Sequence, residues 1–116
     1  MIVEYEKRGR TAVITLNRPE ARNAVSGELA QALEEAIDKL EADDDVWVGI
    51  LAGNGPVFCA GADLSEMADK GAVYQPWAGA DGPLARPCAK PVIAAVEGHA
   101  VAGGLGVALW ADMRVA

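Results

Sequence analysis

The spacing of apolar residues predicts one well-defined amphipathic helix near the start of the chain. Within residues 26–42 the apolar side chains recur at steps of three and four and form a single stripe. Ser26 is the expected N-cap of this helix, and Glu28 lies favourably in its first turn. The stripe consists of Leu29, Ala30, Leu33, Ala36, Ile37 and Leu40.

Strands and helices are expected to alternate along the rest of the chain. The predicted strands cover 2–7, 11–16, 46–52, 91–96 and a last segment that starts at Met113. Short helices are predicted from Asp63 through Met67 and onward from Ala102. Such alternation indicates an α/β fold with a largely parallel sheet.

Two of these predicted strands, 46–52 and 91–96, are almost entirely apolar, as strands covered on both faces of a sheet are. Trp47 and Trp110 are interpreted as core residues. The chain ends inside the last predicted strand. Residues 1–116 are therefore expected to be the N-terminal part of a single domain whose C-terminal part is absent from this chain.

Composition and charge narrow the classes of function. The 116 residues carry a net charge of −7, which repels nucleic acid and anionic lipid. No apolar run approaches the roughly 18 residues of a membrane span, and the first six residues do not resemble a signal peptide. We therefore expect a cytoplasmic protein with no nucleic-acid or membrane partner.

The cysteines and the histidine argue against a metal site. Cys59 and Cys88 lack CxxC spacing, and His99 is the single histidine of the chain. Both cysteines are expected to be buried, reduced thiols.

Two short segments that follow predicted strands are rich in residues with small side chains. They are Ala60-Gly61-Ala62-Asp63 and Ala102-Gly103-Gly104. Glycine and alanine allow close approach of a ligand to the backbone, and the free N–H groups at a helix start attract negative charge. Two such turns could aim two N–H groups at one oxygen, which is the geometry of an oxyanion hole. Alternatively, these glycines serve only tight turns and close packing. Dinucleotide and P-loop motifs are absent.

Four motifs in order and spacing resemble the crotonase (enoyl-CoA hydratase/isomerase) family. The resemblance covers essentially the whole chain except residues 70–88. It implies a crotonase-like (ClpP/crotonase) spiral of ββα units, of which this chain would hold the N-terminal portion only. The motifs are Ile14-Thr-Leu-Asn-Arg-Pro-Glu-Ala-Arg-Asn-Ala, Phe58-Cys-Ala-Gly-Ala-Asp-Leu, Lys90-Pro-Val-Ile-Ala-Ala-Val-Glu-Gly-His-Ala and Ala102-Gly-Gly.

The resemblance also implies a site for an acyl-CoA thioester. The two oxyanion-hole N–H donors would be Ala62 and Gly103. Coenzyme A would be part of the substrate, with no separate cofactor and no metal, and the family's assemblies imply a homotrimer or hexamer. Arg22 either meets a CoA phosphate or is a solvated surface arginine. The implied substrate-binding residues are Ala21, Arg22, Ala24, Ala60, Gly61, Asp63, Leu64 and Gly104.

One departure from the family pattern leaves the chemistry open. Family hydratases carry a glutamate three residues after the second donor, and this chain has Gly106 there. Three interpretations follow: hydratase or isomerase chemistry with a base from elsewhere, a thioester hydrolase or decarboxylase, or a non-catalytic acyl-CoA-binding homologue.

Other polar residues could replace the glutamate that is missing at position 106, and aromatic residues could line an acyl pocket. Asp63 is expected to be a turn or cap residue, Glu66 to be solvated, and Glu97 and His99 to lie outside the acid–base positions. Tyr74 and Trp77 are candidates for an acyl pocket.

Overall fold

The computed structural model describes residues 1–70, 84–85 and 87–116. Tyr74 and Trp77 therefore lie outside the described residues. The strands are β1 (Val3–Arg8), β2 (Thr11–Leu16), β3 (Val48–Gly53), β4 (Val57–Cys59), β5 (Val92–Ala95), β6 (His99–Ala100) and β7 (Met113–Val115). The helices are the 3-10 turn η1 (Pro19–Ala21), α1 (Gly27–Ala42), α2 (Leu64–Lys70) and α3 (Gly103–Trp110).

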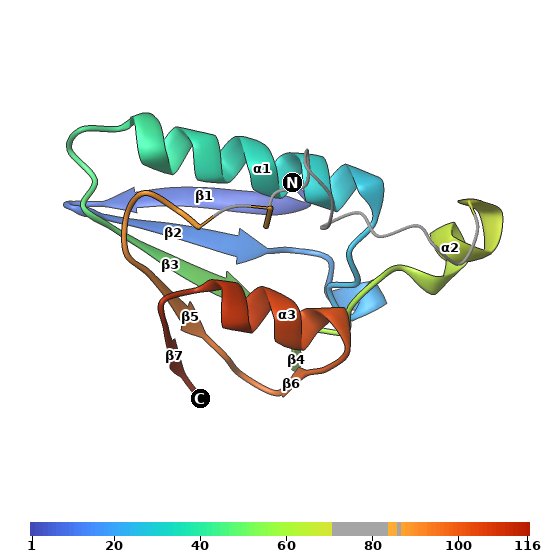
Figure 1. Cartoon of the computed structure of the whole chain (residues 1–116). Helices are drawn as coiled ribbons and strands as arrows, with labels where there is room; N and C mark the ends of the chain where they lie inside the picture. Colours follow the sequence, from blue (N-terminus) through green and yellow to red (C-terminus); the bar gives the residue numbers. More distant parts are fainter. Residues whose placement is uncertain (71–83, 86) are drawn as a thin grey trace.

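A five-stranded sheet forms the frame of the molecule (Figure 1). Its order is β1-β2-β3-β5-β7, with an antiparallel β1–β2 hairpin and parallel pairing in the remainder. Gly9, at φ +61°, lies in the hairpin turn between β1 and β2, a conformation that glycine adopts readily. The prediction of an α/β fold with a largely parallel sheet is confirmed.

A second, two-stranded parallel sheet pairs β4 with β6. In Figure 1 the arrowheads of β2 and β3 point toward the end of the molecule where η1, β4, β6 and α2 lie. Turns that follow parallel strands therefore collect at this end, as expected for strands whose carboxyl ends share an edge.

Helix α1 packs on β1 and β2 through the predicted stripe. The hydroxyl of Ser26 accepts a hydrogen bond from Leu29 N–H at 3.2 Å, which satisfies one of the free donors at the helix start. All six stripe residues are buried, so the predicted cap and apolar face are both confirmed. At the other end the ammonium group of Lys90 donates to the carbonyl oxygens of Leu40 and Asp43. The Leu40 carbonyl thereby gains a partner that the last turn of the helix cannot supply.

The parallel strands bury one face fully and the other only in part. In β3 and β5 the fully buried positions are Gly49, Leu51, Val92 and Ala94. Their neighbours Val48, Ile50, Ile93 and Ala95 are half-buried. The prediction of burial on both faces is thus confirmed on the α1 side, where Leu40 packs against Gly49, and is wrong for the opposite face, which is only half-buried.

The prediction that Trp47 belongs to the core is wrong, since this side chain is 62% exposed. Strand β3 begins one residue later, and Trp47 N–H donates to the carbonyl of Arg10 at 2.7 Å. The Arg10 guanidinium lies 5.0 Å from the centre of the Trp47 ring, a cation–π contact that stabilises the ring at the surface. Trp110 is half-buried against the core, in partial agreement with its prediction.

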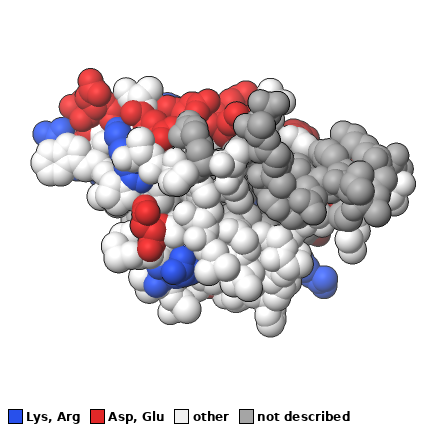
Figure 2. All heavy atoms as spheres, in the orientation of Figure 1, with Lys and Arg blue, Asp and Glu red and all other residues white. Residues whose placement is uncertain are grey.

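Charge and apolar side chains are distributed unevenly over the surface. Figure 2 shows acidic side chains gathered over α1, where Glu28, Glu34, Glu35 and Asp38 are exposed. Helix α3 has no charged residue and exposes Leu105 and Leu109. No helix among the described residues is long and apolar enough to cross a membrane.

Candidate active site

Both glycine-rich turns leave the same edge of the small β4–β6 sheet. Strand β4 leads into residues 60–63 and then α2, while β6 leads through residues 101–102 into α3. Parallel pairing of the two strands, with Cys59 opposite Ala100, puts the two exits next to each other. The N–H of Val101 donates to the Cys59 carbonyl at 3.3 Å and continues this alignment beyond β6.

The backbones of the two turns are in direct contact. A Cβ atom placed on Gly61 would lie 2.9 Å from the nitrogen of Gly103 and 3.3 Å from Ala102 Cβ. Gly61 has φ +98°, a backbone angle that residues with a Cβ rarely adopt. A Cβ on Gly104 would lie 1.9 Å from the Cys59 carbonyl oxygen. Glycine is thus required at both positions for the turns to meet.

Two backbone N–H groups at this junction have no hydrogen-bond acceptor among the described residues. The carbonyl of Gly61 accepts from Val25 N–H at 2.7 Å, and Asp63 N–H donates to Val25 O at 3.0 Å. These two hydrogen bonds form a parallel bridge in which Val25 binds the residues before and after Ala62. The Ala62 N–H therefore points away from Val25. Gly103 is the first residue of α3, where an N–H has no partner within the helix.

The implied CoA-contacting segments also lie together. Ala60 N–H donates to the Arg22 carbonyl at 3.0 Å, and Ala24 N–H donates to the Ala21 carbonyl at 3.0 Å. Residues 21–25 therefore run beside residues 60–63. Arg22 is exposed and its backbone lies in the left-handed region at φ 54°. Leu64 is 77% exposed.

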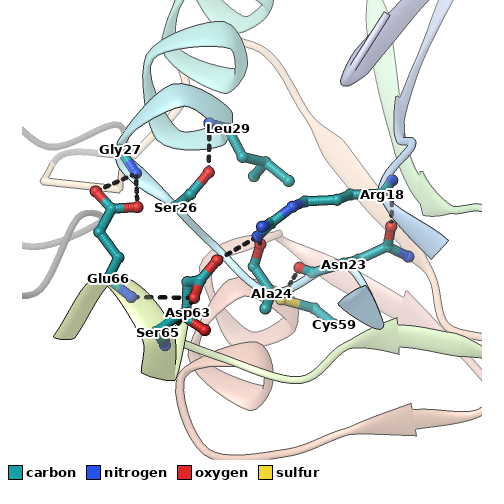
Figure 3. A network of polar contacts seen from close by, with 10 residues as sticks. All are labelled: Arg18, Asn23, Ala24, Ser26, Gly27, Leu29, Cys59, Asp63, Ser65 and Glu66. Atoms are coloured by element: carbon teal, nitrogen blue, oxygen red, sulfur yellow. Dashed lines mark hydrogen bonds and ion pairs between the residues drawn. The ribbon is translucent and has the colours of Figure 1, made fainter. Parts of the chain in front are cut away.

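Asp63 joins these segments through its side chain (Figure 3). One carboxylate oxygen accepts from Ser65 N–H at 2.9 Å and Glu66 N–H at 3.2 Å, which caps α2. The other lies 2.6 Å from the Arg18 guanidinium. The hydrogen bond from Arg18 is the main reason that the pKa of the Asp63 carboxyl lies below its ordinary value, and the two backbone donors add to it. The predicted cap role of Asp63 is confirmed.

Asn23 is a structural centre of the site that the sequence did not reveal. Its side chain is fully buried, and its amide nitrogen donates to the carbonyls of Asn54, Val57 and Phe58 at 2.9–3.1 Å. Its oxygen accepts from Arg18 N–H at 2.8 Å. Through these bonds Asn23 ties the segment after β2 to β4. Its one available sequence signal was its place inside a family motif.

Glu66 differs from its prediction as a solvated residue. Both of its carboxylate oxygens lie 3.1 Å from Gly27 N, the first N–H of α1 (Figure 3). A carboxylate is favourable at this end of a helix because the N-terminus carries partial positive charge. Glu66 therefore anchors α2 to α1.

The remaining candidates differ in how far they are buried. Glu97 and His99 are exposed. Cys59 is buried, burial raises the pKa of its thiol, and the thiol donates to the Asn23 carbonyl at 3.2 Å. Cys88 is half-buried, so the prediction of a buried thiol holds for Cys59 alone. Among the described residues, no group of three or more His, Cys, Asp or Glu side chains is arranged to hold a metal ion. In the part of the chain that the structure describes, a Cβ on Gly106 would meet no atom within 4 Å.

Two of the three glycines of α3, Gly104 and Gly106, are expected to respond oppositely to alanine. Gly104→Ala should lower the free energy of unfolding by about 3 kcal/mol, because the new methyl group collides with a backbone carbonyl. The matched control Gly106→Ala should raise it by up to about 1 kcal/mol through helix propensity. Denaturant unfolding of both variants measures the difference, and equal effects would contradict the close contact at Gly104.

Known proteins resemble this chain in sequence and in fold. A family model described as enoyl-CoA hydratase/isomerase matches residues 6–116. Enoyl-CoA hydratase EchA19 of Mycobacterium tuberculosis is 42% identical, over 96% of this chain and 44% of the relative. A short-chain-enoyl-CoA hydratase of Clostridium acetobutylicum is 39% identical, over 98% of this chain and 46% of the relative.

The crystal structure of enoyl-CoA hydratase EchA1 from Mycobacterium marinum superposes with a TM-score of 0.87 at 45% identity. The superposition covers 97% of this chain and 44% of that one. The chain thus spans less than half the length of these relatives, with the crotonase fold over the part they share. By sequence and by fold, the chain belongs to the enoyl-CoA hydratase/isomerase family.

Proposed function

We propose that the protein binds an acyl-CoA thioester and holds its carbonyl oxygen between the N–H groups of Ala62 and Gly103. The reaction would be of the hydratase/isomerase type. Water adds to the β carbon of an enoyl thioester, and the displaced electron pair moves onto the thioester oxygen to form an enolate. The two amides stabilise that negative charge, and protonation of the α carbon then completes the addition.

The contact between the two turns is the observation that carries this proposal. The Gly61 backbone lies against the Gly103 nitrogen, and the Ala62 and Gly103 N–H groups have no acceptor among the described residues. Backbone donors fixed in advance cost no reorganisation when charge develops on the substrate. Residues 21–25, which run beside residues 60–63, offer main-chain groups for the CoA portion.

The open position at Gly106 supports a second candidate function, a non-catalytic acyl-CoA-binding role. A carboxylate here would stand one helical turn from the Gly103 amide, and Gly106 supplies none. Loss of a general acid–base group costs about 10²–10⁴-fold in rate. The same open space suits a hydrolase or decarboxylase with a bulkier substrate. All three functions share thioester binding.

The protein is therefore expected to bind crotonyl-CoA, even if it hydrates this thioester slowly. Calorimetric titration should give tighter binding of the thioester than of free coenzyme A, since the free thiol has no carbonyl for the two amides. The free coenzyme is the matched control because it keeps the nucleotide and the pantetheine arm. Absence of binding by either ligand would reject the proposal.

A further inference from the structure

We infer that the ion pair between Arg18 and Asp63 is a positioning device that fixes the direction of the Ala62 N–H. The inference rests on the proposed function, because it assigns a task to residues beside the proposed donor. In this inference neither side chain contacts the substrate. Both would act through the main chain of the 60–63 turn.

The ion pair is well placed for this task because Asp63 directly follows Ala62. The Arg18 nitrogen that lies 2.6 Å from the Asp63 carboxylate also donates to the Ala24 carbonyl at 3.0 Å. The two side chains are only 24% and 12% exposed, so solvent screens their attraction less than at the open surface. One guanidinium thus holds the 60–63 turn against the segment that precedes α1.

The peptide group that bears the Ala62 N–H is held on one side through its own carbonyl, that of Gly61, which accepts from Val25 N–H at 2.7 Å; the ion pair supplies a second anchor beyond it. Gly61, at φ +98°, has the greatest backbone freedom of any residue type, and the peptide group that bears the Ala62 N–H follows it directly. Past that peptide the chain is held at Asp63 from three sides. Its own N–H donates to Val25, its carboxylate caps α2, and the same carboxylate binds Arg18.

Two further contacts show that Arg18 and α2 are themselves held firmly. The backbone N–H of Arg18 donates to the buried Asn23 side chain at 2.8 Å. Glu66, which follows Asp63 by three residues, binds the first N–H of α1. The anchor therefore connects the proposed donor to the main body of the fold (Figure 3). Because the pKa of Asp63 is lowered, the carboxylate is charged at neutral pH and the pair is complete there.

The test uses acetoacetyl-CoA, whose enolate absorbs ultraviolet light, bound to the full-length protein at fixed pH. The enolate-to-keto ratio of the bound ligand reports stabilisation of the oxyanion and requires no turnover. We expect Asp63→Asn and Arg18→Met each to lower this ratio by about tenfold or more. The double variant should fall no further, because both changes remove one interaction. Arg18→Lys should restore part of the ratio.

Two controls separate positioning from general damage. Glu6→Gln removes the same charge from the exposed Arg8–Glu6 pair on β1 and should leave the ratio unchanged. Affinity for free coenzyme A, which has no thioester carbonyl, should fall by less than the enolate ratio in the Arg18 and Asp63 variants. If Asp63→Asn does not fold, the Arg18 variants decide, since they leave the Asp63 cap of α2 in place.

Opposite results are equally informative. A wild-type ratio in folded Arg18→Met and Asp63→Asn proteins would overturn the positioning role while leaving the proposed function intact. Equal losses of thioester and free coenzyme A affinity without a change in the ratio would also overturn it. Wild-type protein that binds no CoA ligand would overturn the proposed function, and this inference with it.

Discussion

Replacement of Gly103 by proline is expected to lower turnover of an accepted acyl-CoA thioester by about 10²–10³-fold. The change removes one of the two proposed oxyanion donors, because proline has no N–H. Gly103 is the first residue of α3, a position where helices tolerate proline. Steady-state hydration of crotonyl-CoA and the enolate ratio of bound acetoacetyl-CoA measure the loss.

The preceding residue calls for a control in this experiment. Ala102 has φ 50° and ψ −126°, and a following proline restricts its conformation further. The double variant Ala102→Gly/Gly103→Pro relaxes that position and should show the same loss. Unchanged turnover in either folded variant would count against the assignment of the Gly103 amide.

Gly106→Glu is expected to raise the rate of crotonyl-CoA hydration by about 10²-fold or more. A general acid–base group typically supplies 10²–10⁴-fold. Position 106 lies three residues after Gly103 on α3, so its side chain shares a face with the proposed donor. A Cβ there would meet no atom of the described residues within 4 Å, so the first carbon of the new side chain meets no obstacle. Initial rates at saturating substrate measure the gain.

The matched control for this gain is Gly106→Gln. Glutamine has the size and helix propensity of glutamate but exchanges no proton at neutral pH. A rate increase in the glutamate variant alone would identify proton transfer as the missing function. Equal rates in both variants would show that loss of this carboxylate does not limit the reaction.

Some parts of the fold could be predicted from the sequence because local pattern determines them. Helix α1 is the clearest case. Six apolar positions at helical spacing and one capping serine define its start and its buried face, and the structure confirms both. The Asp63 cap was also predictable, since a short acidic side chain before a helix satisfies its first N–H groups.

Other parts depend on contacts between segments distant in the chain. Asn23 is buried because three acceptors approach it from 31–35 residues away, and a single sequence does not show which polar residue such a site requires. Glu66 reaches the α1 N-terminus across 39 residues in the same way. Trp47 belongs to a β-prone run but lies just before the strand, where Arg10 covers its ring. For Asn23, Glu66 and Trp47 alike, contacts with residues distant in the chain determine where the side chain lies, and local propensity does not.

The short β4–β6 ladder determines which changes the proposed site tolerates. Neighbouring strands are spaced about 4.8 Å apart by their main-chain hydrogen bonds, whatever side chains they carry. Strand pairing thus sets the distance at which the two turns leave the sheet toward the proposed donors. Side-chain exchanges nearby can alter the direction of one amide, the acyl group that fits or the reaction that follows, while the spacing of the two strands stays constant. An inserted or deleted residue in either strand would slip the register and move one amide away from its counterpart.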